Sequence, residues 1–170
     1  MKQLIKFLIL MVLILCVVSC GKRYAQKDLE AFIARMTGGE DELLDGFFEK
    51  MEYKINKTTS EGSKKTIINT TVRVINVPAY AEDYIEQMMP LILAGASEEI
   101  INENIFRYFA ELFKKEDLLY KETTLDVIMF KNAGGDWEIL DGQFELMKAM
   151  TGVFAELEEI SGLRGLKIIY

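Results

Sequence analysis

Residues 66–77 read Thr-Ile-Ile-Asn-Thr-Thr-Val-Arg-Val-Ile-Asn-Val, a stretch rich in β-branched side chains. Successive side chains of a strand point to opposite faces, so one face of this stretch is largely apolar and contains Ile68, Thr70, Val72 and Val74. The other face is mixed and contains Asn69, Thr71 and Arg73. The pattern predicts a strand with one buried face, which ends at Pro78 because proline has no N–H to donate.

Three further strands are predicted around this one. Residues 52–59 form a hairpin with it across the turn-forming residues 60–63. The period of two returns over 118–131, and the turn sequence Asn-Ala-Gly-Gly-Asp at 132–136 leads into a partner strand at 137–140. The chain therefore contains two antiparallel hairpins.

Apolar residues at helical spacing occupy the remaining segments. They predict helices at about 25–37 and 43–51, two helices within 80–113 that Pro90 and Gly95 interrupt, and a C-terminal helix over 144–160 with a fault at Gly152. Residues 162–170 fit a final strand or a tail equally well. Because no strand–helix–strand alternation requires a parallel sheet, the expected fold class is α+β, with N-terminal helices and an antiparallel sheet packed against helices.

Composition excludes several kinds of site. The chain has no histidine, which removes Ser-His and Cys-His catalysis and histidine-bearing zinc sites. It has neither a Gly-rich phosphate loop nor a Gly-x-Ser-x-Gly sequence. Its formal charge is −7, and no dense block of Lys or Arg interrupts this acidity, so nucleic acid is not an expected partner. We expect no catalytic residue, no metal site and no cofactor.

The first twenty residues have the three parts of a secretory signal. Lys2 and Lys6 provide positive charge, and the apolar run 7–18 follows them. Twelve helical residues span roughly 18 Å, well short of the ~30 Å hydrocarbon core of a bilayer. A permanent transmembrane anchor is therefore the weaker interpretation of this run.

The run ends at Val17-Val18, and together with the next two residues these form Val17-Val18-Ser19-Cys20, which matches a lipobox. The N-terminus therefore resembles that of bacterial lipoprotein precursors. The resemblance implies a lipid on the Cys20 sulfur and cleavage just before it. It divides the chain into a signal peptide (1–19), a lipidated anchor and tether (20–23) and one domain (24–170). The expected location is the cell envelope, outside the cytoplasm: the outer membrane in a Gram-negative organism, otherwise the outer face of the cell membrane.

The middle of the chain carries a second resemblance. Residues 52–55, 71–78 and 135–139 resemble strand and turn patterns of small bacterial lipoproteins of unknown function with an NTF2-like, cystatin-like α+β domain, over roughly residues 48–150. That fold implies a bent sheet wrapped around helices, with a conical cavity. The candidate cavity residues are Tyr53, Tyr84, Tyr108, Asp126 and Trp137. The simpler interpretation makes the aromatic residues ordinary core and places Asp126 on a solvated sheet face beside Glu122 and Thr124.

Two functional classes remain open. The first, which we favour, is a non-enzymatic binding or interaction module, anchored to the membrane through Cys20, whose partner is an envelope protein or a small apolar ligand. The alternative is a small NTF2-like hydrolase or isomerase that uses a carboxylate, Asp126, as general base. Because Cys16 leaves with the signal and Cys20 is lipidated, the domain has no free thiol, which favours the first class.

Overall fold

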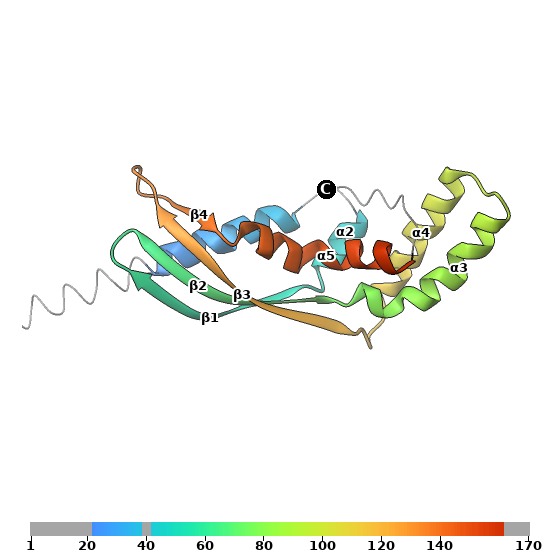
Figure 1. Ribbon diagram of the computed structural model, residues 1–170, viewed down its shortest axis with the longest axis horizontal. Coiled ribbons are helices and arrows are strands. Elements are labelled where there is room, and N and C mark those ends of the chain that lie inside the picture. Colours follow the sequence, from blue (N-terminus) through green and yellow to red (C-terminus); the bar gives the residue numbers. More distant parts are fainter. Residues whose placement is uncertain (1–21, 39–41, 162–170) are drawn as a thin grey trace, which may run out of the picture. The chain divides into compact units, whose positions relative to one another are not determined.

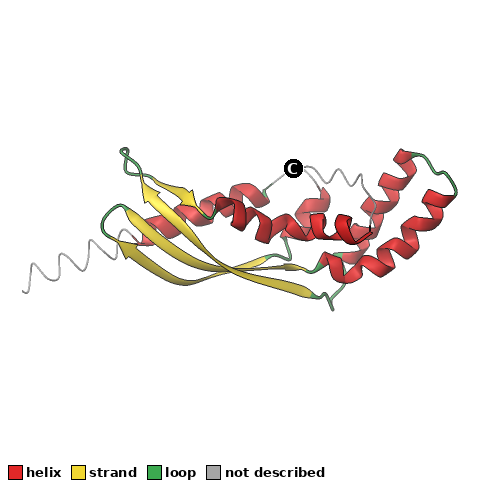
Figure 2. Ribbon diagram, viewed as in Figure 1, coloured by secondary structure: helices red, strands yellow, loops and turns green. Residues whose placement is uncertain are grey.

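The computed structural model of this chain describes residues 22–38 and 42–161. It is an α+β structure with a four-stranded antiparallel sheet in the order β1-β2-β3-β4 (Figure 2), as the sequence predicts. The predicted signal peptide, Cys20 and residues 162–170 lie outside the described residues. Within the described ranges, no helix is both long enough and apolar enough to cross a membrane.

Figure 1 shows the elements in order along the chain. A helix over residues 22–37 comes first. The labelled elements follow: α2 (Glu42–Phe48), β1 (Glu52–Glu61), β2 (Lys65–Ile75), the short 3-10 helix η1 (Val77–Tyr80), α3 (Ala81–Leu93), α4 (Glu98–Leu112), β3 (Tyr120–Lys131), β4 (Trp137–Asp141) and α5 (Gln143–Ser161).

Strand β2 has the predicted two-faced character. From residue 66 to residue 74 its buried side chains alternate along the strand: Thr66, Ile68, Thr70, Val72 and Val74. Ile75, the last residue of β2, is buried as well. Side chains of the other face contact β3 in three pairs: Asn69 with Asp126, Thr71 with Thr124, and Arg73 with Glu122. Residue numbers rise along β2 as they fall along β3, so the two strands are antiparallel. β4 continues the sheet antiparallel to β3, with Lys131 opposite Trp137. The apolar face predicted from the sequence is confirmed.

The chain forms two compact units. The first consists of Lys54–Thr71, Thr124–Phe144 and the described residues up to Met36. Its N-terminal helix buries Ala25, Leu29 and Ile33, while the strands bury Ile68, Val127 and Met129. The Gln26 amide donates a hydrogen bond to the Thr58 hydroxyl of β1 over 2.7 Å, which fixes this helix beside the sheet.

The second unit contains the described residues of Thr37–Tyr53, Val72–Thr123 and Glu145–Tyr170. Its core is aromatic. Phe47 of α2 and Phe154 of α5 lie with ring centroids 4.8 Å apart, and Phe109 of α4 contacts Phe154 at 5.9 Å. Tyr84 of α3 stacks on Phe109 at 5.7 Å. Four helices therefore share one set of interlocking rings, each of which buries a large apolar area.

Two helices continue through residues that the sequence predicts will interrupt them. α3 runs past Pro90 to Leu93, and the Pro90 carbonyl still accepts a 3.0 Å hydrogen bond from the Ala94 N–H. Proline cannot donate a backbone N–H bond, and here this loss falls in the last turn of the helix. Gly95, with φ +70°, does mark the end of α3.

The predicted fault at Gly152 is also wrong, because α5 is continuous from Gln143 to Ser161. Glycine costs about 1 kcal/mol in a helix relative to alanine. Val153, Phe154 and Leu157, directly after the glycine, are all buried. Burial of each such side chain contributes about 1.5–3 kcal/mol, which outweighs the glycine penalty.

Candidate functional site

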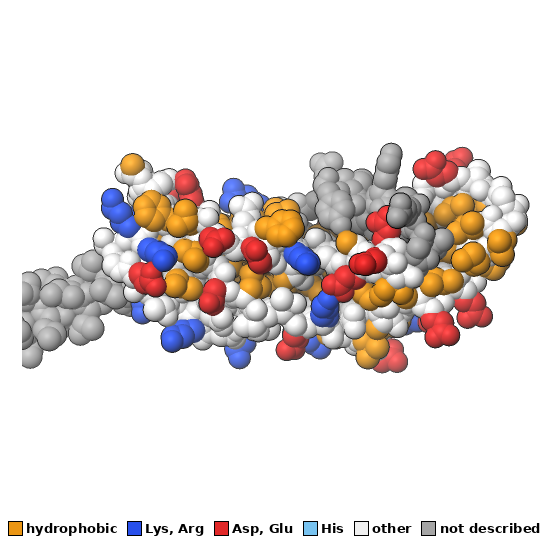
Figure 3. Space-filling model, viewed as in Figure 1, with side chains coloured by type: hydrophobic (Ala, Val, Ile, Leu, Met, Phe, Trp, Pro, Cys, Tyr) orange, Lys and Arg blue, Asp and Glu red, His pale blue; other side chains and the backbone are white. Residues whose placement is uncertain are grey.

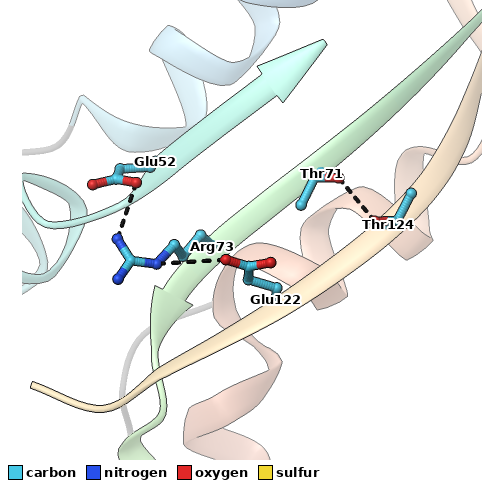
Figure 4. A network of polar contacts seen from close by, with 5 residues as sticks. All are labelled: Glu52, Thr71, Arg73, Glu122 and Thr124. Atoms are coloured by element: carbon cyan, nitrogen blue, oxygen red, sulfur yellow. Dashed lines mark hydrogen bonds and ion pairs between the residues drawn. The ribbon is translucent and has the colours of Figure 1, made fainter. Parts of the chain in front are cut away.

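Five polar side chains from three strands bond to one another on the exposed side of the sheet in the first unit. We call this set the Asn69 array: Asn56 of β1, Asn69 and Thr71 of β2, and Thr124 and Asp126 of β3. The Asn56 side-chain amide donates to Asn69 Oδ1 at 3.0 Å and to the Thr71 hydroxyl at 2.8 Å. The Asn69 amide donates to Asp126 Oδ1 at 2.6 Å. Thr71 and Thr124 share a 2.8 Å hydroxyl contact (Figure 4).

The array follows directly from the strand pattern. Asn69 and Thr71 are two residues apart in β2, so they share the face opposite the buried Thr70. The antiparallel register then places Asp126 and Thr124 directly across from them. Exposed hydrogen bonds of this kind add little to stability, but they hold the side chains in one arrangement. The array is therefore an ordered polar surface.

A second polar group, the Arg73 cluster, lies in the second unit and comprises Arg73, Glu52, Glu122 and Tyr120. The Arg73 guanidinium lies 3.0 Å from a Glu52 oxygen and 3.7 Å from a Glu122 oxygen (Figure 4). Its carbon lies 3.7 Å from the centre of the Tyr120 ring, within the range of a cation–π contact. Two carboxylates already balance the charge of Arg73, so this cluster ties β1, β2 and β3 together and offers no free cation to an anionic ligand.

Asp126 lies where strand alternation places it, on the solvent-facing side with Thr124 and away from the buried Val127. Its carboxylate is exposed and accepts a hydrogen bond from the neutral Asn69 amide. A carboxyl group becomes a useful base near neutral pH chiefly through loss of water around it, which disfavours the charged form. Asp126 is open to solvent and lacks such a dry environment.

The four aromatic candidates occupy different places. Tyr84 and Tyr108 lie together in the second unit, with ring centroids 5.4 Å apart. Tyr53, in the same unit, is 40% exposed on β1, while Trp137 is buried in the first unit. Burial raises the pKa of both Tyr84 and Tyr108 to about 12, from 10.0. These two phenols therefore stay neutral at ordinary pH and belong to the aromatic core.

A surface pocket of about 500 Å³ lies in the second unit, between the end of α2 and the C-terminal half of α4. Gly46 lies at one side, and the other lining residues are Glu49, Lys50, Phe106, Ala110, Phe113 and Lys114. Sequence reasoning missed this site because it depends on the contact between α2 and α4. One signal was present: Phe106 is a large apolar residue outside the main apolar stripe of its helix.

The α3–α4 hairpin carries exposed apolar side chains as well. Leu93 is 80% exposed and Ile100 is also exposed, and Figure 3 shows hydrophobic side chains gathered over these two helices. No group of three or more acidic, cysteine or histidine residues that could hold a metal ion occurs among residues 22–38 and 42–161. The polar array and the pocket are thus the two features with geometry suited to a ligand.

Known proteins share little detectable similarity with this chain. No family model and no curated protein match the chain. A solved structure that resembles it is the crystal structure at 2.62 Å resolution of the "putative lipoprotein (ycdA) from Bacillus subtilis subsp. subtilis str. 168", with 21% identity and a TM-score of 0.44. The similarity covers 74% of this chain and only 44% of that one. We therefore infer function from the residues of this chain alone.

Proposed function

We propose that this chain is a lipid-anchored, non-enzymatic binding module of the bacterial cell envelope, held on the membrane through Cys20. Its partner is a polar component of the envelope, bound through the Asn69 array. The observation that carries this proposal is the array itself: five side chains from three strands, held in one arrangement by their own hydrogen bonds on an exposed face.

The lipobox supports the anchor. Val17-Val18-Ser19-Cys20 follows a positively charged start and an apolar run of the length typical of a signal peptide. A diacylglycerol on Cys20 supplies two hydrocarbon chains, and each buried CH₂ contributes about 0.8 kcal/mol. Two chains are enough for stable attachment, whereas one chain exchanges off the membrane.

The geometry of Asp126 favours binding over catalysis. In the NTF2-like enzyme alternative, this carboxylate would lie at the base of a dry cavity and act as the general base. Asp126 is instead exposed and bonded to Asn69. Among the described residues, only its Oδ1 atom accepts a side-chain hydrogen bond, so the other carboxylate oxygen can accept one from a partner.

An ordered polar face suits a partner that offers its own hydroxyl or amide groups. Because the array side chains are fixed before binding, little side-chain entropy is lost when a partner contacts them. The sheet supplies donors from asparagine, acceptors from aspartate, and threonine hydroxyls that do both.

The anchor is tested by growing expressing cells with radiolabelled palmitate. The native chain and Cys16→Ser should both incorporate label, because residue 16 leaves with the signal peptide, whereas Cys20→Ser should incorporate none. Equal labelling of Cys20→Ser and the native chain would exclude the lipid anchor.

The binding face is tested by co-sedimentation of the full-length protein, solubilised in detergent, with an insoluble envelope fraction of the same cells. The array variant is Asn69→Ala with Asp126→Asn, and the matched control is Asn102→Ala with Glu103→Gln on the exposed side of α4. We expect at least tenfold weaker binding for the array variant and no change for the control. Equal binding of both variants would rule out the Asn69 array as the binding surface.

A further inference from the structure

We infer that the pocket between α2 and α4 binds a single-chain amphiphile with an anionic head group. The hydrocarbon chain lies against Phe106 and Phe113, and the head lies between Lys50 and Lys114. This site lies in the second unit and uses none of the residues of the Asn69 array, so it is independent of the function proposed above.

The inner wall of the pocket is the edge of the aromatic core. Phe113 stacks on Phe109 with centroids 5.9 Å apart and contacts Phe47 at 5.7 Å. Phe113 is buried and held by these rings on several sides, so the part of it that lines the pocket is a rigid apolar surface. A hydrocarbon chain placed against it extends the apolar packing of the core.

Phe106 forms the outer apolar wall. It precedes Ala110 by four residues and Phe113 by seven, the spacing that places three side chains on one face of a helix. Phe106 is 44% exposed although it is a large apolar side chain. A bound chain would remove this surface from water, at about 25 cal/mol per Å² of apolar area.

The size of the pocket agrees with such a ligand. Its volume of about 500 Å³ lies within the roughly 300–1,000 Å³ common for small-molecule sites. Gly46 has no side chain to occupy the space beside Phe113, and a Cβ added there would lie 3.7 Å from the Phe113 ring. Glycine and alanine on facing helices thus keep the pocket open.

The charge at the rim indicates an anionic head. The formal charge of −7 becomes −9 when Lys2 and Lys6 leave with the signal peptide. Two lysines nevertheless line this pocket, against the single acid Glu49. Within the described part of the chain, neither Lys50 nor Lys114 forms an ion pair. Their ammonium groups remain available to a carboxylate or a phosphate.

Lys114 also follows the C-terminus of α4, where a cation stabilises the helix dipole. A loss of binding on removal of the lysine could therefore reflect a weakened helix. The test consequently needs a variant that blocks the pocket without a change of charge, and Ala110→Leu does this because leucine is also a good helix former.

The experiment uses the full-length protein in membranes of expressing cells and a dodecanoate that carries a photoreactive diazirine on its chain. After irradiation, mass spectrometry measures the labelled fraction of the peptide that contains Phe106 and Phe113. Unlabelled dodecanoate should compete for the site, whereas dodecyltrimethylammonium, with the same chain and the opposite charge, should compete at least tenfold less well. Dodecyl phosphate as a third competitor distinguishes a preference for carboxylate from one for phosphate.

Ala110→Leu should reduce labelling at least tenfold, while Ala155→Leu, the same change on the exposed side of α5, should not. Lys50→Gln with Lys114→Gln should reduce labelling several-fold, and replacement of both by arginine should restore it. Lys54→Gln with Lys57→Gln on β1 is the charge-matched control. Unchanged labelling of Ala110→Leu, or equal competition by the cationic amphiphile, would overturn the inference.

Discussion

At the scale of single residues, Tyr84 and Tyr108 have almost the same surroundings, but their hydroxyl groups differ in hydrogen bonding. Tyr108 donates to the Tyr80 carbonyl at 3.1 Å. The Tyr84 hydroxyl is buried and has no hydrogen-bond partner among the described residues. A buried polar group without a partner is unfavourable by about 1–3 kcal/mol in mutational data.

Phenylalanine at these two positions should therefore act in opposite directions. We expect Tyr84→Phe to raise the free energy of unfolding by about 1 kcal/mol, because it removes an unpaired hydroxyl. Tyr108→Phe should lower it by about 1 kcal/mol, because the Tyr80 carbonyl loses its donor. Urea unfolding followed by circular dichroism measures both. A loss of stability in both variants would mean that the Tyr84 hydroxyl has a partner in solution.

The same tyrosines predict how stability changes at alkaline pH. Burial raises the pKa of Tyr84 and Tyr108 to about 12, above the ordinary value of 10.0 for an exposed phenol. Between these values the unfolded chain has released the phenolic protons and the folded chain still holds them. The free energy of unfolding should therefore fall as pH rises from about 10 to about 12. The fall should be smaller in Tyr84→Phe, and an identical pH profile for variant and native protein would contradict this account.

The sequence predicted part of the candidate site at the level of single residues. Period-two alternation placed Asn69 and Thr71 on one face and Asp126 beside Thr124. It did not show that Asn69 faces Asp126, because register between strands far apart in the sequence is set by tertiary packing. The pocket was missed for the same reason, since its lysines lie 64 positions apart.

At the scale of elements, the turn between β4 and α5 depends on one glycine. Gly142 has φ +84°, a conformation in which other residues are strained. A Cβ added there would lie 2.6 Å from the Asp126 carbonyl oxygen, which belongs to the backbone of β3 and cannot move away.

Gly142→Ala should therefore lower the free energy of unfolding by about 2–4 kcal/mol, through backbone strain and the clash together. Gly95→Ala is the matched control, because Gly95 has φ +70° but no atom within 4 Å of the added Cβ. It should cost about 1 kcal/mol. Thermal unfolding of both variants measures the difference, and equal losses would show that the clash has no effect.

The elements themselves were largely predictable. Strands β1 to β4 and their turns agree with alternation and with the turn-forming sequences at 60–63 and 132–136. The errors concern Pro90 and Gly152, where local propensity disfavours a helix that packing maintains. Buried Met88 fixes α3 just before its proline, and buried Met150 and Phe154 fix α5 on both sides of its glycine.

At the scale of the whole molecule, the two compact units share their strands. β1, β2 and β3 each contribute residues to both units. If one unit unfolded, each of these three strands would therefore lose the part that belongs to that unit, and the other unit would be left with shortened strands. Residues 24–170 should consequently unfold in a single cooperative transition without a disulfide, as the single-domain prediction requires. Two separate transitions, followed by circular dichroism and Trp137 fluorescence, would contradict that prediction.

The central claim is that the exposed face of the sheet meets an envelope partner while Cys20 holds the protein on the membrane. Phe130 lies on that face, two alternations beyond Asp126 in β3, and is exposed. Phe144, at the start of α5, is even more exposed and provides a control of the same residue type. Both phenylalanines can be replaced by the photoreactive benzoylphenylalanine.

The most direct test is photocrosslinking in living cells from these two positions in the full-length protein. We expect one discrete adduct from position 130 and none from position 144. The adduct from position 130 should disappear when Asn69→Ala and Asp126→Asn are introduced and persist with Asn102→Ala and Glu103→Gln. No adduct from position 130, or an adduct that the array variant leaves unchanged, would contradict the claim that the Asn69 array is where this protein binds.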